Sequence, residues 1–193
     1  MSTASLTRQV DFTVNNLLVA FEGEVNARAR YLAFAARADA DGHLGIGSLF
    51  RAAARAEQIH ARNQARVLRQ MGEDTDIAAE PCVVHSTEYN LQSALAGETY
   101  EIEVLYPSFI EEATTGINST AARSFIWALE AEKTHATLFS EALQLLQDEV
   151  PDSRVNEACD FFVCPVCACT SRSLPEENCT ICSYPSVRAE TIR

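Results

Sequence analysis

The sequence predicts an all-α four-helix bundle followed by a small domain that a metal holds together. Two observations support this prediction. Apolar residues recur at helical intervals up to about residue 150, and after Pro151 the composition changes to Cys, Pro, Ser and Thr without that period. A Gly-Glu pair is followed about one helical hairpin later by Glu-x-x-His, and this combination occurs twice. The copies contain Glu24, Glu57 and His60, and Glu98, Glu132 and His135.

Length and charge limit the possible classes of function. The 193 residues suffice for one domain of about 150 residues and a small appendage. Lys and Arg number 15 against 27 Asp and Glu, a formal charge of −12, so nucleic acid is not expected as a partner. Residues 1–10 show no signal-peptide pattern, and no stretch approaches the roughly 20 apolar residues of a membrane span. We therefore expect a cytoplasmic protein without a membrane partner.

The four helices follow, in chain order, from apolar periodicity and capping residues. Leu17, Phe21 and Val25 show the helical period in the first helix. Gly72 is a natural C-terminal cap for the second helix, and Pro107 predicts a kink inside the third. The expected ranges are about Phe12 to Ala38, Leu44 to Met71, Ser86 or Thr87 to Thr115, and from the turn at 116–119 to near Val150.

The link between the second and third helices favours one topology. Residues 73–85 are polar and, at about 3.3 Å per residue, reach about 43 Å, enough to pass along a helix of about 27 residues at 1.5 Å per residue. The second and third helices can therefore run parallel, as in a ferritin-like bundle, whereas the up-down-up-down alternative needs no such crossover. We expect the bundle in residues 1–150 and the second domain in residues 157–193, too short for a sufficient apolar core without a metal.

The repeated motif predicts a two-metal site inside the bundle. Residues three apart point to one side of a helix, so each Glu-x-x-His pair can hold one metal. A single such pair is most often a solvated helix face, but the duplicated set matches a di-iron bundle, in which two helices give one Glu each and two give Glu-x-x-His. Glu101, three residues after Glu98, is a seventh candidate ligand, with a surface acid as the alternative, and Ala27 is its counterpart in the first helix.

Several segments of this chain resemble the rubrerythrin family. The matching segments are Ala20-Phe21-Glu22-Gly23-Glu24 with Ala27-Arg28 and Arg30-Tyr31, Ala56-Glu57-Gln58-Ile59-His60-Ala61, Gly97-Glu98-Thr99-Tyr100-Glu101 with Tyr106-Pro107, and Ala131-Glu132-Lys133-Thr134-His135. The resemblance covers nearly the whole chain. It implies that Glu101 binds one iron in the diferric state and that His60 does so in the diferrous state. It also implies that Tyr31 and Tyr106 lie beside the site, where the residues alone indicate core aromatics with a polar end.

Five of the seven cysteines lie between positions 164 and 182. Two Cys-x-x-Cys pairs, Cys164 with Cys167 and Cys179 with Cys182, suit a tetrahedral iron or zinc ion, and the spacing does not choose between them. The resemblance implies a rubredoxin-like Fe(Cys)₄ domain that delivers electrons. In rubredoxins the residue after each pair is usually Gly, whereas this chain has Ala168 and Ser183. Backbone N–H bonds to sulfur tune the reduction potential of such a site, so the sequence does not fix that potential here.

The remaining Cys and His residues have simpler interpretations. Cys169 could replace Cys167 as a ligand, but the symmetry of the two pairs favours Cys167. Cys82 and Cys159 have no partner pattern and are interpreted as free thiols. The two other histidines, at positions 43 and 85, lie at predicted helix ends or loops and are interpreted as turn or cap residues.

The leading functional hypothesis is a non-haem di-iron peroxidase that reduces hydrogen peroxide to water and serves in defence against oxidative stress. The resemblance implies re-reduction through the Fe(Cys)₄ domain by a reductase or rubredoxin that draws on a nicotinamide nucleotide, and we expect a homodimer. A ferroxidase that handles iron is the first alternative, although an electron-delivering tail has no use in storage. A zinc ribbon that binds a protein partner, with the bundle as scaffold, is the second.

Overall fold

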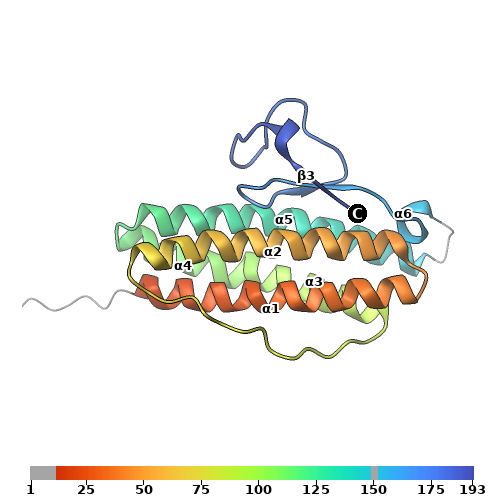
Figure 1. The fold of residues 1–193 in the computed structure, drawn as a ribbon, viewed down its shortest axis with the longest axis horizontal. Coiled ribbons are helices and arrows are strands. Elements are labelled where there is room, and N and C mark those ends of the chain that lie inside the picture. Colours follow the sequence, from red (N-terminus) through yellow and green to blue (C-terminus); the bar gives the residue numbers. More distant parts are fainter. Residues whose placement is uncertain (1–11, 149–151) are drawn as a thin grey trace, which may run out of the picture.

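Four long helical segments lie side by side in the computed structural model, which describes residues 12–148 and 152–193 (Figure 1). They are α1 (Phe12–Ala40), α2 (Leu44–Gln70), a third segment made of α3 (Thr87–Tyr100), the π-helical turn η1 (Glu101–Leu105) and α4 (Tyr106–Thr115), and α5 (Ser119–Gln147). The predicted four-helix bundle is confirmed. The expected end of the last helix near Val150 and the domain limit at residue 150 lie outside the described residues.

Local sequence explains where these helices begin and end. The backbone of Gly72 has φ of 87°, the left-handed conformation that favours glycine after a helix. The hydroxyl of Ser86 accepts a hydrogen bond from the N–H of Tyr89 at the start of α3. Asn118 caps α5 in the same way, because its Oδ1 accepts from the N–H of Ala121 at 3.0 Å.

The connection from α2 to α3 gives the bundle its topology. Residues 71–86 run back along the outer side of α1, so α2 and α3 point in the same direction (Figure 1). The N–H of Glu80 donates to Oδ1 of Asn26 at 2.8 Å, which attaches this connection to α1. The predicted ferritin-like order with a long crossover is therefore confirmed.

The third segment is not a regular α-helix throughout. Pro107 cannot donate a backbone hydrogen bond and its ring crowds the preceding turn. Directly before it, the N–H of Tyr106 bonds to the carbonyl of Glu101, five residues back instead of four. The expected kink at the proline therefore takes the form of a π-helical turn, which inserts one residue into the helix.

The C-terminal part folds into a small antiparallel sheet. Its elements are α6 (Ser153–Asn156), β1 (Phe161–Val163), β2 (Thr170–Ser171), the 3₁₀ turn η2 (Ser186–Arg188) and β3 (Glu190–Ile192). The strand order is β2-β1-β3, and Val163 pairs with Thr170 on one side and Glu190 on the other. This C-terminal unit (residues 152–193) lies over α2 and α5 (Figure 1).

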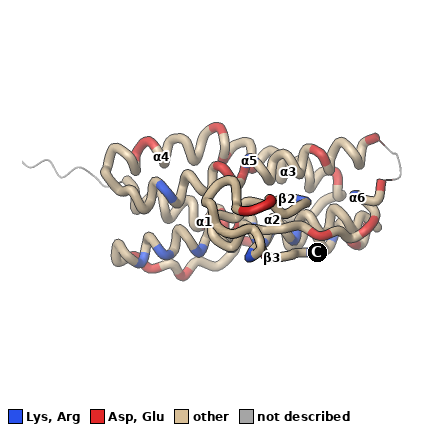
Figure 2. Tube along the Cα trace, turned by 90° about the horizontal axis from the view of Figure 1, so that it is seen from above, with Lys and Arg blue, Asp and Glu red and all other residues tan. Residues whose placement is uncertain are grey.

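Arginines of α2 attach the C-terminal unit to the bundle. The Lys and Arg residues of the bundle lie mainly on α1 and α2 (Figure 2). Arg55 donates from Nε and Nη2 to the two carboxylate oxygens of Glu190 at 2.6 and 2.7 Å, and Arg51 Nε donates to the carbonyl of Arg193 at 2.7 Å. Within the described residues, no helix is long and apolar enough to cross a membrane.

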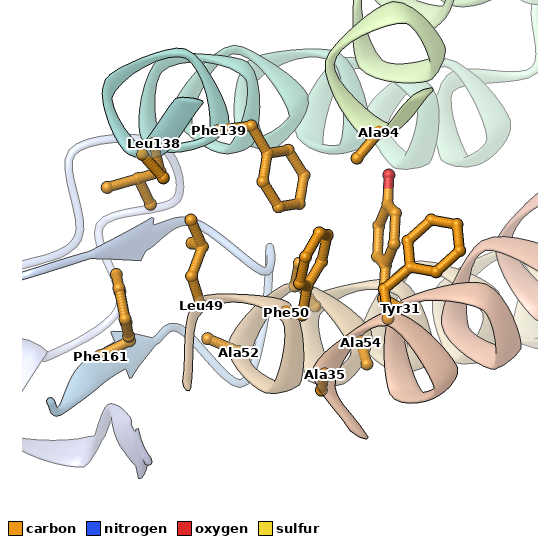
Figure 3. Close-up of a cluster of buried hydrophobic side chains, with 14 of the residues drawn as sticks. Tyr31, Ala35, Leu49, Phe50, Ala52, Ala54, Ala94, Leu138, Phe139 and Phe161 are labelled. Carbon is orange, nitrogen blue, oxygen red and sulfur yellow. The ribbon is translucent and has the colours of Figure 1, made fainter. Parts of the chain in front are cut away.

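The apolar core consists of two clusters along the bundle. The first includes Tyr31, Phe50 and Phe139, and β1 adds Phe161 at its edge (Figure 3). The rings of Phe50 and Phe139 lie 5.3 Å apart between centroids, and the hydroxyl of Tyr31 points towards Ala94 of α3 (Figure 3). The second cluster lies nearer the other end and is built by residues such as Leu17, Phe21, Leu68, Tyr106, Phe109 and Phe125. Along the chain, Glu24, His60 and Glu98 each fall between a residue of one cluster and a residue of the other. The other three predicted ligands of the two Glu-x-x-His pairs and their Gly-Glu partners, Glu57, Glu132 and His135, fall among residues of the first cluster.

Candidate metal centres

Six of the predicted ligand side chains meet inside the bundle, and none is more than 2 % exposed. Their potential ligand atoms form two overlapping groups, each with all atoms within 4.8 Å of one another. The groups are Glu24, Glu57, His60 and Glu132, and Glu57, Glu98, Glu132 and His135. The sequence suggested one metal for each Glu-x-x-His pair. The structure adds that Glu57 and Glu132 belong to both groups and can bridge two metals.

Both imidazoles direct Nδ1 into the carboxylates. His60 Nδ1 lies 2.8 Å from Glu132 Oε1 and 3.0 Å from Glu57 Oε2. His135 Nδ1 lies 2.6 Å from the other oxygen of Glu132. Nδ1 is therefore the candidate ligand atom of each histidine, and Glu132 lies between the two rings.

The electrostatics of the cluster suit divalent cations. Burial, together with the charge of Glu132, raises the pKa of Glu98 to about 8. Burial alone would lower the pKa of His60, but the carboxylates of Glu132 and Glu24 raise it above its ordinary value. Glu24 Oε2 and His60 Nε2 are buried and lack hydrogen-bond partners among the described residues. Cations would displace protons from such a site and balance its charge, and a set of imidazole and carboxylate ligands fits iron.

Two tyrosines donate hydrogen bonds between the two halves of the bundle, which are α1 with α2 and α3 to α5. Each tyrosine donates to a glutamate of the other half. Tyr31, on the helix of Glu24, donates to Glu98 Oε1 at 2.5 Å. Tyr106, which follows Glu98 in the chain, donates to Glu24 Oε1. Burial raises the pKa of both phenols, so both remain protonated donors at neutral pH. Each tyrosine thereby orients a glutamate that belongs to only one of the two groups.

Glu101 lies beside the cluster and outside both ligand groups. It is placed by η1 and is partly exposed as a residue. Its pKa is nevertheless raised, first by burial of the carboxyl group and then by the charges of Glu24 and Glu132, so the carboxyl group lies within electrostatic range of these ligands. Among the described residues, the structure thus joins six of the seven predicted bundle ligands and holds the seventh near them.

The two Cys-x-x-Cys pairs form a second candidate centre in the C-terminal unit. Cys164 Sγ lies 3.5 Å from Cys182 Sγ, and Cys167 Sγ lies 3.4 Å from Cys179 Sγ. All four sulfurs are within 4.8 Å of one another. Around a tetrahedral metal with bonds of about 2.3 Å, sulfurs are roughly 3.8 Å apart, so the spacing fits such an ion.

The same backbone turn builds both halves of the thiolate site. The N–H of Ala168 bonds to the carbonyl of Cys164, and the N–H of Ser183 bonds to that of Cys179, each at 2.9 Å. Ala168 has φ of 67° and Ser183 has φ of 59°, in the left-handed region. Glycine adopts this conformation without strain, which explains why it is favoured after each pair. Ala168 and Ser183 adopt it at a cost in conformational free energy.

The C-terminal unit contacts the bundle next to the buried histidines. His135 Nε2 lies 3.1 Å from the hydroxyl of Thr170 in β2, and the N–H of Thr170 donates to Thr134 Oγ1 at 3.2 Å. On α2, Arg62 Nη2 donates to the carbonyl of Pro165 at 2.5 Å and Asn63 Nδ2 donates to that of Val166 at 2.8 Å. Both carbonyls belong to residues between Cys164 and Cys167. The Thr170 hydroxyl also donates to the carbonyl of Ala168, so one hydrogen-bonded path runs from His135 to the residue after Cys167.

The sequence did not identify two polar residues beside the bundle site. Gln64 is completely buried and its Nε2 donates to Glu24 Oε1 at 3.0 Å. Its position four residues after His60, on the same helix face, was a usable signal. Thr170 had no local signal, because its contact with His135 joins two separate parts of the chain.

The remaining Cys and His residues lie outside the candidate centres. All seven cysteines are free thiols, and Cys169 packs against the four-thiol cluster without belonging to it. His43 directly precedes α2, and His85 stacks on Tyr89 at 4.5 Å between ring centroids near the start of α3. Neither histidine belongs to a metal-binding group of the described residues.

Comparisons with known proteins point to one family. The family model named Rubrerythrin matches residues 15–143. The chain is 38 % identical to Rubrerythrin-2 of Clostridium acetobutylicum over 172 residues, which cover 88 % of this chain and 91 % of that protein. It is 35 % identical to Nigerythrin of Nitratidesulfovibrio vulgaris over 178 residues, which cover 91 % of this chain and 84 % of that protein.

Solved structures show the same fold. A structure of nigerythrin in its fully reduced, all-ferrous state is similar with a TM-score of 0.85 at 32 % identity, covering 98 % of this chain and 91 % of that one. A Desulfovibrio desulfuricans bacterioferritin, described with a diiron site, is similar with a TM-score of 0.66 at 21 % identity, covering 71 % of this chain and 81 % of that one. At that identity the second likeness shows the ferritin-like fold alone.

Proposed function

The chain belongs to the rubrerythrin family, with a ferritin-like di-iron-type bundle and a rubredoxin-like cysteine cluster, and on this premise we propose that it is a peroxidase. It would reduce hydrogen peroxide to two molecules of water at a non-haem di-iron centre and be re-reduced through an Fe(Cys)₄ centre. The observation that supports this most directly is the contact between the C-terminal unit and the candidate di-iron site, where Thr170 of β2 meets His135. A storage protein does not need an electron-transfer unit against its metal site.

The residues of the bundle have distinct proposed tasks. Two ferrous ions held by the six buried ligands would supply the two electrons that the cleavage of the O–O bond requires. The ligand carboxylates fix the positions of the ions, and Tyr31 and Tyr106 orient Glu98 and Glu24 by hydrogen bonds. The apolar clusters on either side keep bulk water away from the site.

Reduction of peroxide to water also consumes two protons. Glu101 is suited to provide one, because burial and the neighbouring carboxylates raise its pKa while the residue keeps partial contact with solvent. It can therefore hold a proton on its carboxyl group near the site and regain one from water.

We propose that Glu101 is also an alternative ligand to one iron. In the structure His60 belongs to a four-residue group and Glu101 does not. That arrangement is the one that the family resemblance assigns to the diferrous state. The π-helical turn supports an exchange, since such turns place a side chain out of regular register and recur at functional sites.

Electrons would enter through the C-terminal unit. We propose iron in its four-thiolate site, although the geometry also suits zinc, and a reductase or rubredoxin supplied by a nicotinamide nucleotide as the external donor. The unpaired thiols of this site need a reducing compartment, which supports a cytoplasmic location.

We further propose a homodimer and two folding units. A groove lined by Leu95, Tyr100, Val104 and Leu143 on α3, η1 and α5 exposes apolar surface that a second copy could cover. Light scattering after size-exclusion chromatography tests this association. The division into residues 1–150 and 157–193 is tested below by the loss of the thiolate site.

The decisive experiment compares two oxidants. The full-length chain is loaded with iron, reduced under anaerobic conditions and mixed by stopped flow with equal concentrations of hydrogen peroxide or O₂. Peroxide should oxidise the bundle irons at least about tenfold faster, a difference of about 1.4 kcal/mol in activation free energy. An equal or faster reaction with O₂ would refute the peroxidase proposal and favour ferroxidase activity.

Metal analysis tests the remaining alternative, in which the C-terminal unit is a zinc ribbon that binds a protein partner. The proposal predicts about three irons per chain for protein produced with iron, two in the bundle and one in the tail. Ferric thiolate absorbs visible light and zinc thiolate does not. A zinc-filled tail with an iron-filled bundle would indicate an interaction module in place of an electron donor.

A further inference from the structure

The two halves of the bundle differ at one matched position next to the site. Gln64 follows His60 by four residues, and Phe139 follows His135 by four residues. Residues four apart lie on the same helix face, so both side chains face the interior beside a site histidine. Both are 0 % exposed. One half therefore has a buried amide where the other has a buried aromatic ring.

Gln64 makes two hydrogen bonds that have no equivalent in the other half. Its Nε2 donates to Glu24 Oε1 at 3.0 Å and to the hydroxyl oxygen of Tyr106 at 3.2 Å. Tyr106 in turn donates its proton to the same oxygen of Glu24. Because both neighbours present acceptor atoms to Gln64, its NH₂ group must be the end that faces them. The three side chains form a closed triangle that joins α1, α2 and α4.

The matched glutamate lacks this second donor. Glu98 Oε1 accepts from Tyr31, and the ring of Tyr31 packs against Phe139 with 5.4 Å between centroids. Phe139 has no donor group. Among the described residues, Glu24 Oε1 therefore accepts hydrogen bonds from a phenol and an amide, whereas Glu98 Oε1 accepts one from a phenol and none from an amide.

Stability alone does not explain an amide at position 64. Its Oε1 is buried and has no hydrogen-bond partner within the described residues. A buried amide oxygen without a partner lowers stability, and an apolar residue, as at Phe139, avoids that loss. The amide is retained at a position where its N–H group reaches a candidate metal ligand.

We propose that Gln64 is a positioning residue that orients Glu24 and makes the two metal positions unequal. The position of Glu24 and His60 binds a divalent cation more tightly than the position of Glu98 and His135. This inference rests on the proposed di-iron site. Partners that orient a metal ligand by a hydrogen bond change metal affinity by about 10- to 100-fold when they are removed.

The test uses Co²⁺ as the probe and binding as the readout. Metal-free full-length protein receives two equivalents of Co²⁺, of which the thiolate site takes one, as its sulfur-to-cobalt absorption reports. Anomalous diffraction then measures the occupancy of each bundle position. In the wild-type chain the Glu24 position should hold at least about threefold more Co²⁺ than the Glu98 position. Equal occupancies would overturn the proposal without any variant.

Two matched substitutions assign the difference to the amide. Gln64→Met keeps the volume of the side chain and removes the donor, and should weaken Co²⁺ binding at the Glu24 position by about tenfold or more. Phe139→Met introduces the same residue at the equivalent position, where no hydrogen-bond donor is lost, and should leave the occupancy ratio unchanged. An unchanged ratio in Gln64→Met, or an equal change in both variants, would refute the positioning role.

The outcome is independent of the proposed reaction. Equal occupancies in a chain that still prefers peroxide to O₂ would refute the role of Gln64 and leave the peroxidase proposal intact. Unequal occupancies in a chain that prefers O₂ would support the role of Gln64 and refute the peroxidase proposal.

Discussion

Replacing Thr170 by Val should slow electron delivery to the bundle while leaving the first oxidation by peroxide unchanged. The hydroxyl of Thr170 lies 3.1 Å from His135 Nε2 and is the point where β2 meets the candidate di-iron site. The hydroxyl also donates to the carbonyl of Ala168, one residue after Cys167. Val keeps the shape of the side chain and removes both hydrogen bonds.

The size of the effect follows from the burial of the histidine. His135 is 1 % exposed, so water does not replace the lost partner of Nε2. A buried donor left without a partner costs about 1 to 3 kcal/mol, which lowers the ratio of docked to undocked molecules by about 5- to 150-fold. Arg62 and Asn63 still hold the loop between Cys164 and Cys167, which favours the lower end of that range. We expect re-reduction to slow by about five- to tenfold.

Stopped-flow absorption can follow the two half-reactions separately. Chemically reduced protein is mixed with one equivalent of peroxide, and the oxidised protein is then mixed with a donor that reduces the thiolate iron. Ser171→Ala is the matched control, because Ser171 Oγ lies on the same strand and donates to the nearby carbonyl of Ser173. An unchanged re-reduction rate in Thr170→Val, or an equal slowing of the peroxide step, would refute this route.

Three further predictions test the centres one at a time. The double variant Cys179→Ser, Cys182→Ser should lose the thiolate-iron absorption and retain the circular dichroism of the bundle helices; a loss of helicity would contradict separate folding units. Glu101→Ala should lower peroxide turnover while two irons stay bound, because the six buried ligands remain; loss of bundle iron would make Glu101 an indispensable ligand, and no effect would make it a surface acid. The metal-free protein should have a lower melting temperature at pH 8 than at pH 5. The folded-state pKa of Glu98 is raised to about 8 from about 4.5, so its contribution to stability is complete below pH 4.5 and is lost as the pH rises towards 8, and a higher melting temperature at pH 8 would contradict this assignment.

Local patterns predicted much of the fold and of the candidate ligand set. Helix periodicity and caps such as Gly72 and Ser86 depend on neighbouring residues, so the sequence locates them to within a few positions. Spacing also predicted that the two Cys-x-x-Cys pairs suit one tetrahedral metal, and their four sulfurs lie within 4.8 Å of one another. The role of each residue as a ligand stays a prediction until a metal is bound.

Contacts between distant segments could not be predicted. Gln64 meets Glu24 across 40 positions, and Thr170 meets His135 across 35. Each contact depends on the docking of complete elements. The spacing from His60 indicates that Gln64 faces the site, but no local pattern indicates that its partner is Glu24, and Thr170 has no local signal at all. The sharing of Glu57 and Glu132 between two ligand groups has the same origin, since it requires α2 and α5 to face each other at close range.

The π-helical turn explains how duplicated halves can give an asymmetric site. Tyr31 follows Glu24 by seven residues, whereas Tyr106 follows Glu98 by eight. Without an adjustment, the extra residue would rotate Tyr106 by about 100° around the helix axis, away from the site. The wider turn of η1 absorbs that residue, and Tyr106 still reaches Glu24 just as Tyr31 reaches Glu98. The insertion thus keeps both hydrogen bonds, from Tyr31 to Glu98 and from Tyr106 to Glu24. It also places the additional carboxylate of Glu101 in the turn itself.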